Sequence, residues 1–129
     1  MMKCLVDIHV LIWSVVDSKK LSEAAKAILR DGENECFFSA ASVWEIALKH
    51  NKHPKDIPIG GEDARQLFLE AGYLEFPVFA KHSAVVERLP DIHQDPFDRM
   101  LVAQAQMESM KLLTHDHILP QYGSFVVRV

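Results

Sequence analysis

Two carboxylates follow apolar runs that predict buried strands. Asp7 comes directly after residues 3–6, and Asp116 comes shortly after residues 111–114. In an open α/β sheet, ligands bind beyond the carboxyl ends of the strands, so both acids are placed where chemistry is done. Aspartate also caps helices, and a capping role explains Asp7 equally well when that residue is considered alone.

Two further acids lie on predicted helices. Glu45 is the one acid in the apolar stretch 43–48, although Lys49, four residues on, could pair with it at the surface. Such an exposed pair contributes only about 0.3–0.5 kcal/mol. Asp98 follows Asp95 and a proline, which are the expected cap and first residue of a helix. We therefore assign Asp95 to structure and Asp98 to chemistry.

Convergence of these four acids would require a cation. Carboxylates about 5 Å apart at an effective dielectric of about 20 repel each other by roughly 3 kcal/mol per pair. Six such pairs sum to roughly 20 kcal/mol, more than the whole net stability of a domain. Mg²⁺ and Mn²⁺ prefer an all-oxygen site of this kind, and they support phosphodiester hydrolysis by activating water and neutralising phosphate charge.

The elements that must position these acids alternate along the chain. Strands are predicted at residues 3–7, 35–39, 74–78, 111–114 and 124–129. Helices are predicted at residues 10–16, 21–30, 40–49, 62–71, 81–89 and 95–109, loops at 51–61 and 90–94, and a turn or short helix at 115–121. Strands that alternate with helices predict an α/β fold, a three-layer sandwich with a mostly parallel central sheet flanked by helices.

The composition is that of an ordinary globular domain. The 129 residues are 49% hydrophobic and 25% charged, with a formal charge of −4. We expect a single domain over residues 1–129, a cytoplasmic location and no membrane association, because no run reaches the length of a membrane span. The charge argues against broad coating of DNA, but it does not exclude a nuclease. Cys4 and Cys36 lie in predicted strands and are expected to be buried free thiols.

The segments around the four acids resemble the PIN-domain family, and within it the VapC-like toxins. The match covers nearly the whole chain. It rests on D-x-H-x-x-x-W at 7–13, S-A-A-S-V-W-E-I-A at 39–47, D-P-F-D-R-M-L-V-A-Q-A at 95–105 and T-x-D at 114–116. The resemblance implies a PIN-like fold, and it places the metal-binding and catalytic acids of the family on Asp7, Glu45, Asp98 and Asp116.

The resemblance also implies a function. A VapC-like protein would be an Mg²⁺- or Mn²⁺-dependent endoribonuclease, neutralised by a protein antitoxin and assembled as a homodimer. The alternatives are a catalytically silent PIN-like module that binds protein or RNA, and a housekeeping RNA-processing nuclease. One position departs from the family pattern: many members carry Thr or Ser after the first Asp, where this chain has Ile8. The Thr114 hydroxyl could partly compensate.

Several neighbouring side chains have two possible roles. His9, His115 and His117 flank the acids and could contact RNA or transfer protons, but a solvent-facing or peripheral role is the simpler interpretation. Trp13 and Trp44 fall within apolar stretches, and we predict core packing for both.

Three features could serve substrate or partner binding. Arg99 could reach the scissile phosphate, or it could pair with Asp95. The apolar helix at 40–48, together with the helix that carries Trp13, could form a groove for an apolar segment of an antitoxin. A basic cluster around the proline-rich loop could guide RNA, although solvated loop charge is the default explanation; it consists of Lys49, His50, Lys52, His53 and Lys55.

Overall fold

The central sheet has five strands, all parallel. The computed structural model describes residues 1–129. The strands are β1 (Lys3–Val6), β2 (Glu35–Ser39), β3 (Leu74–Phe76), β4 (Lys111–Thr114) and β5 (Val126–Arg128). They lie in the order β3-β2-β1-β4-β5, and every neighbouring pair is parallel. The predicted α/β class is confirmed, with a sheet that is wholly rather than mostly parallel.

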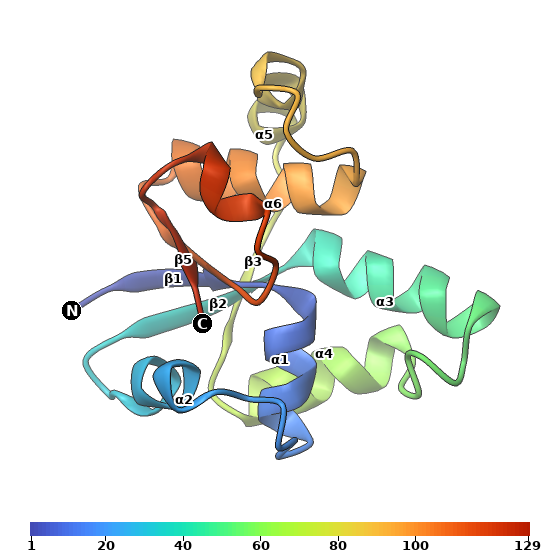
Figure 1. Cartoon of the computed structure of the whole chain (residues 1–129). Helices are drawn as coiled ribbons and strands as arrows, with labels where there is room; N and C mark the ends of the chain where they lie inside the picture. The colour runs from blue at the N-terminus through green and yellow to red at the C-terminus, as the bar shows by residue number, and fades with distance from the viewer.

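Helices cover both faces of the sheet. They are α1 (Ile8–Val15), α2 (Glu23–Arg30), α3 (Ala40–Lys52), α4 (Gly61–Glu70), α5 (Ala80–Val85) and α6 (Pro96–Met107), with 3-10 turns η1 (Val86–Arg88) and η2 (Leu119–Tyr122). Figure 1 shows α5 and α6 on one side of the sheet and α1, α2 and α4 on the other, which is the predicted three-layer arrangement. None of the helices has the length and apolar character needed to span a bilayer.

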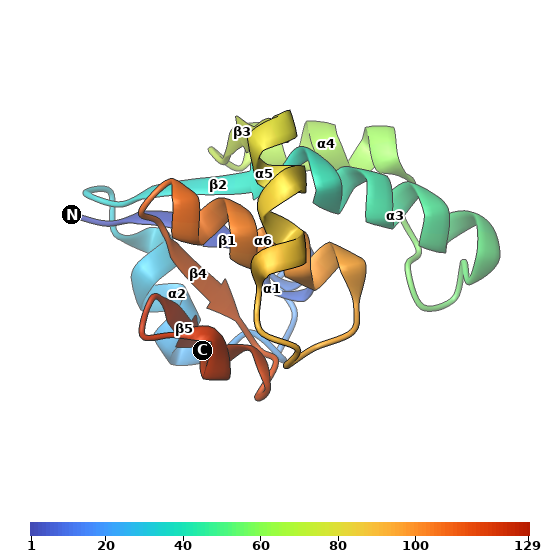
Figure 2. The same cartoon turned by 90° about the horizontal axis from the view of Figure 1, so that it is seen from above.

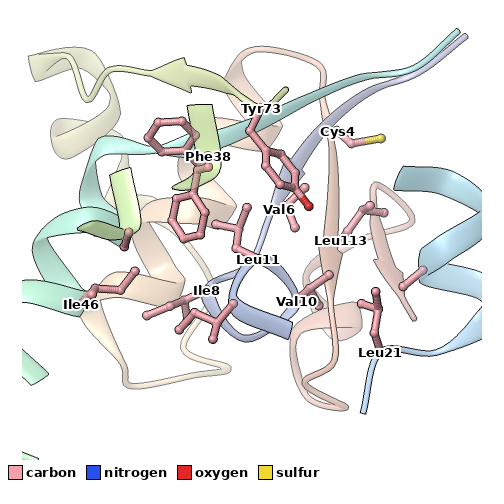
Figure 3. Packing of buried hydrophobic residues seen from close by; sticks show 14 of the residues in the cluster. Cys4, Val6, Ile8, Val10, Leu11, Leu21, Phe38, Ile46, Tyr73 and Leu113 are labelled. Atoms are coloured by element: carbon pink, nitrogen blue, oxygen red, sulfur yellow. The ribbon is translucent and has the colours of Figure 1, made fainter. Parts of the chain in front are cut away.

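Successive side chains of a strand point to opposite faces of the sheet, so the core has two parts. Cys4 and Val6 of β1 pack toward α1, α2 and α4, together with Phe38 of the neighbouring strand (Figure 3). Leu5, between them in sequence, packs toward α6 with Leu112. Burying one large apolar side chain stabilises a fold by about 1.5–3 kcal/mol, so both faces of the sheet hold their helices firmly.

The direction in which the chain adds strands to the sheet reverses at β1. The chain builds β1, β2 and β3 outward in one direction, and it then returns through α5 and α6 to place β4 on the other side of β1. Figure 2 shows α6 lying across the sheet above β1 and β4. The carboxyl ends of β1 and β4 therefore flank a topological switch point, where open α/β sheets bind their ligands.

Several boundaries differ from the predicted ones. Helix α3 continues into the predicted loop as far as Lys52, and the His53 N–H still donates to the Lys49 carbonyl at 2.7 Å. The predicted helix at 81–89 divides into α5 and the turn η1. Helix α6 begins at Pro96 as predicted and ends at Met107.

Candidate metal-binding site

All four predicted acids line one pocket of about 380 Å³ beyond the carboxyl ends of the strands. Two of them follow β1 and β4, and the other two come from α3 and the first turn of α6. The full lining is Asp7, Ile8, His9, Glu45, Lys49, Asp95, Asp98, His115, Asp116, His117 and Ile118. Acids up to 109 residues apart in sequence are thus brought together by the sheet order.

The Asp7 carboxylate accepts a hydrogen bond on one oxygen and has no partner for the other. Its side chain is 5% exposed, and its Oδ2 accepts a hydrogen bond of 2.6 Å from the Thr114 hydroxyl. Its Oδ1 is buried and has no partner. Asp7 precedes α1, but its side chain makes no capping bond, so the capping explanation fails. Burial raises the pKa of this carboxyl above its ordinary value.

Glu45 has the same combination of burial and a free oxygen. It is 3% exposed, its Oε2 pairs with Lys49 Nζ at 2.5 Å, and its Oε1 is buried without a partner. The pair predicted for the surface therefore exists, but its acidic half is inside the pocket. Burial raises the pKa of Glu45, and the Lys49 ammonium only partly offsets this.

Asp98 is strongly perturbed by its surroundings. Burial, followed by the charges of Asp7, Asp95, Glu45 and Asp116, raises the pKa of Asp98 to about 8. Asp95 caps α6 as predicted, since its Oδ1 accepts hydrogen bonds from the N–H groups of Phe97 at 2.8 Å and Asp98 at 3.1 Å. The capping residue also faces the pocket, so it adds a fifth carboxylate to the cluster.

Asp116 is the one acid of the four that is stabilised in its charged form. Partial burial opposes ionisation, but hydrogen bonds from the Ile118 N–H at 2.7 Å and from His93 at 3.2 Å lower the pKa of Asp116 overall. Its own backbone N–H donates to the Thr114 hydroxyl at 3.0 Å. Thr114 thus connects Asp116 with Asp7.

His93 belongs to the site but was not predicted from the sequence. Its Nε2 lies 3.2 Å from Asp116 Oδ2 and 3.5 Å from Asp98 Oδ2. Its Nδ1 accepts a hydrogen bond of 3.1 Å from the Asp95 N–H, which leaves the ring proton on Nε2. The Nε2–H group therefore donates to Asp116 and lies beside Asp98. The available sequence signal was its position two residues before Asp95, where the motif at 95–105 begins.

Arg99 is engaged away from the pocket. Its guanidinium donates to the Val86 and Pro90 carbonyls at 3.0 Å each, to the Tyr122 hydroxyl at 3.1 Å and, at 3.3 Å, to the His93 carbonyl. Neither predicted role for this side chain, phosphate contact or a pair with Asp95, fits that geometry. Arg99 instead fastens the loop that carries His93.

The two tryptophans differ from each other. Trp13 is half-buried against the core, stacks on His9 and meets His115 edge-on. Trp44 is 62% exposed, so the prediction that it packs in the core is wrong. Its ring contacts Phe97 at the border of an apolar groove of about 470 Å³ between α3, α5, η1 and α6. The groove predicted between α3 and the helix of Trp13 is therefore replaced by one on the α6 side.

The donor set fits a hard divalent cation. Two buried carboxylate oxygens, Asp7 Oδ1 and Glu45 Oε1, lack any partner, and buried polar atoms are normally hydrogen-bonded. The ligands available are mainly carboxylate oxygens, as Mg²⁺ and Mn²⁺ prefer. Ile8 packs into the core, and the Thr114 hydroxyl supplies Asp7 with a hydrogen bond, as expected for the compensating residue.

The parallel sheet and the acidic pocket at its switch point define an α/β protein with a candidate metal-binding site. Comparison with known proteins gives its family. Residues 4–124 match the PIN domain, so the chain belongs to the PIN domain family. No curated protein matches the chain significantly.

Solved structures share the fold at low sequence identity. VapBC2 from Rickettsia felis, bound to a DNA fragment from their promoter, aligns with a TM-score of 0.69 and 12% identity over 99% of this chain and 98% of that one. A toxin–antitoxin complex from Klebsiella pneumoniae aligns with a TM-score of 0.66 and 17% sequence identity, over 96% of this chain and 95% of that chain. FitAcB from Neisseria gonorrhoeae aligns with a TM-score of 0.56 and 20% sequence identity, over 92% of this chain and 91% of that chain. Likeness at this level establishes the fold.

Proposed function

We propose that this chain is a divalent-metal-dependent endoribonuclease and the toxin of a toxin–antitoxin pair. The observation that carries the proposal is the pair of buried, partnerless oxygens on Asp7 and Glu45, two residues that line a pocket with three more carboxylates. PIN domains are generally nucleases, which supports hydrolysis of a phosphodiester. The structural neighbours include toxin–antitoxin complexes, which supports the biological role.

Asp7, Glu45, Asp98 and Asp116 would hold the ion. When bound, Mg²⁺ or Mn²⁺ supplies a Lewis acid that neutralises phosphate charge and makes water a better nucleophile. The five pocket carboxylates and Lys49 carry a formal charge of −4 when all are ionised, so the pocket attracts divalent cations and repels RNA until they bind.

The remaining groups would orient the acids and receive the substrate. Thr114 fixes the rotation of the Asp7 carboxylate through its 2.6 Å hydrogen bond to Oδ2, which leaves Oδ1 without a partner. His93 holds Asp116 beside Asp98. Lys49, whose side chain is 41% exposed, presents the positive charge within the pocket that an incoming phosphate would meet. Water would attack phosphorus directly, with no covalent enzyme intermediate.

Cleavage of RNA by the purified chain tests the proposal. We expect cleavage with Mg²⁺ or Mn²⁺, and its loss with EDTA or in the Asp7→Asn variant. Asp63→Asn, an exposed substitution on α4, is the matched control and should cleave like the wild-type chain. A folded, antitoxin-free chain that cleaves none of a varied set of RNAs would contradict the proposal.

Two alternatives give different results in the same experiment. A catalytically silent binding module would fail to cleave RNA and to bind Mn²⁺ in a direct titration. A housekeeping RNA-processing nuclease would cleave RNA, but its expression would not arrest growth and no neighbouring gene would relieve such an arrest. We favour the toxin because of its structural neighbours.

The proposed partners are an antitoxin protein and a second copy of the chain, in the cytoplasm. Exposed apolar side chains such as Trp44 are the kind of surface that protein partners cover. Co-expression with the product of an adjacent gene should yield a stable complex that lacks nuclease activity. The mass of the free chain in solution tests the homodimer, and a monomer at all concentrations would contradict it.

A further inference from the structure

The two cysteines are opposite each other on the first two strands. The parallel pairing of β1 with β2 places Cys4 directly across from Cys36. Both side chains lie on the α1, α2 and α4 face, where Cys4 belongs to the core and Cys36 packs against it (Figure 3 labels Cys4). Neighbouring strands are about 4.8 Å apart, within the Cα separation of about 4.4–6.8 Å that a disulfide bond requires. Both residues are free thiols.

The two thiols differ in access. Cys4 is completely buried, whereas Cys36 is half-buried and lines a pocket of about 260 Å³. Lys26, Arg30 and Asp31 line the same pocket, so its charged side chains are positive on balance. None of the acids of the metal-binding site lines this pocket. Reactive cysteines typically occupy partly exposed, electropositive surroundings of this kind.

We propose that Cys36 and Cys4 form a hydroperoxide-sensitive pair, in which Cys36 is oxidised first and Cys4 closes an intrachain disulfide. A small, uncharged hydroperoxide is the chemical class of oxidant that the pocket would admit. The proposal is independent of nuclease activity, because it uses a different pocket and different residues.

The chemistry proceeds in two balanced steps. The Cys36 thiolate attacks one oxygen of the hydroperoxide and the O–O bond breaks; the other oxygen leaves as an alkoxide or hydroxide that takes up a proton, and Cys36 becomes a sulfenic acid. The Cys4 sulfur then attacks the Cys36 sulfur, and the displaced hydroxide leaves with the thiol proton as water. The two thiols lose two electrons, and the peroxide gains them.

The difference in access assigns the order in which the thiols react, and the contact between them agrees with it. A hydrogen bond from Cys4 lowers the pKa of the Cys36 thiol, and the same bond, together with burial, raises the pKa of Cys4. The more accessible sulfur is therefore also the more readily ionised one. The disulfide would join the strand that precedes Asp7 to the strand that leads into α3 and Glu45, and so would fix the relative position of these two acids.

Mapping of thiols after peroxide treatment tests the proposal. The folded, reduced chain is exposed to hydrogen peroxide, and the remaining thiols are then labelled with a maleimide under denaturing conditions. We expect the wild-type chain to lose both thiols, to yield one cross-linked peptide containing Cys4 and Cys36, and to regain both thiols with dithiothreitol. The five methionines also take up oxygen, so a C4S/C36S double variant supplies the background.

Two single variants assign the roles. In C4S, Cys36 should form a sulfenic acid that dimedone traps, because no second thiol can displace it. In C36S, the buried Cys4 should keep its thiol. Circular dichroism checks that each variant is folded, and the wild-type peptide map tests the disulfide without any variant. Reversed reactivity, disulfides only between chains, or two intact thiols in the treated wild-type chain would each overturn the proposal.

Discussion

Replacing Asp98 with Asn should stabilise the metal-free protein at alkaline pH. The pKa of Asp98 is raised from 3.8 to about 8, first by burial and then by the charges of Asp7, Asp95, Glu45 and Asp116. Between about pH 4 and pH 8, the folded chain keeps a proton on Asp98 that the unfolded chain has released. Stability therefore falls as pH rises through this window, and the loss is complete above it.

The size of the effect follows from the shift. Each pKa unit corresponds to about 1.36 kcal/mol, so a charged Asp98 destabilises the fold by at most roughly 5–6 kcal/mol. Its coupled neighbours can share the proton, and we expect about half of that value, roughly 3 kcal/mol. The opposing attraction between Asp98 and the positive end of α6 is only about 0.3–1 kcal/mol. Repulsion and burial therefore outweigh it.

Urea unfolding in EDTA measures this difference. The Asp98→Asn chain should match the wild-type chain below about pH 4 and exceed its free energy of unfolding by roughly 3 kcal/mol above about pH 8. The exposed Asp63→Asn substitution is the control and should follow the wild-type curve. A variant no more stable than wild type at high pH, or a difference that does not vary with pH, would refute the reasoning.

Two further predictions concern the loop beside the site. His93→Phe removes the donor to Asp116 and Asp98, so Mn²⁺ affinity and RNA cleavage should fall about 10–100-fold. His93→Gln keeps an N–H donor and should lose less of both. An unchanged Mn²⁺ titration for His93→Phe would exclude this role of His93. Arg99→Met leaves several backbone carbonyls without their charged donor and should lower the free energy of unfolding by roughly 2–3 kcal/mol. Urea unfolding that shows no greater loss than the exposed Arg88→Met would count against that bonding scheme.

The sequence predicted the acids because their signals are local. Asp7 directly follows an apolar strand, and Asp98 follows a capping aspartate and a proline at the start of a helix; each pattern spans only a few residues. The parallel order of the strands then brings together side chains from distant segments without any further sequence signal. Local patterns therefore sufficed for the fold class, whereas the choice of these four acids also drew on the resemblance to the PIN-domain family.

The errors arose where a side chain depends on distant contacts. His93 reaches Asp116, 23 residues away, because Arg99 and Tyr122 fasten an irregular loop, and no periodic pattern describes such a loop. Trp44 lies in an apolar helix, but periodicity cannot show which face of a helix the rest of the fold covers. The role of Arg99 was missed for the same reason, since its partners are the Tyr122 hydroxyl and backbone carbonyls of other segments.

The hydrogen bond between Thr114 and Asp7 spans 107 positions of the chain and has a consequence for synthesis. A ribosome extends a chain at about 5–20 residues per second, so β1 waits several seconds for β4 to emerge beside it. Contacts of such long range also slow folding, because the loop must close before the contact forms. A nascent chain therefore lacks the complete pocket until β4 and Asp116 have emerged from the ribosome, and any activity of that pocket begins only after that point.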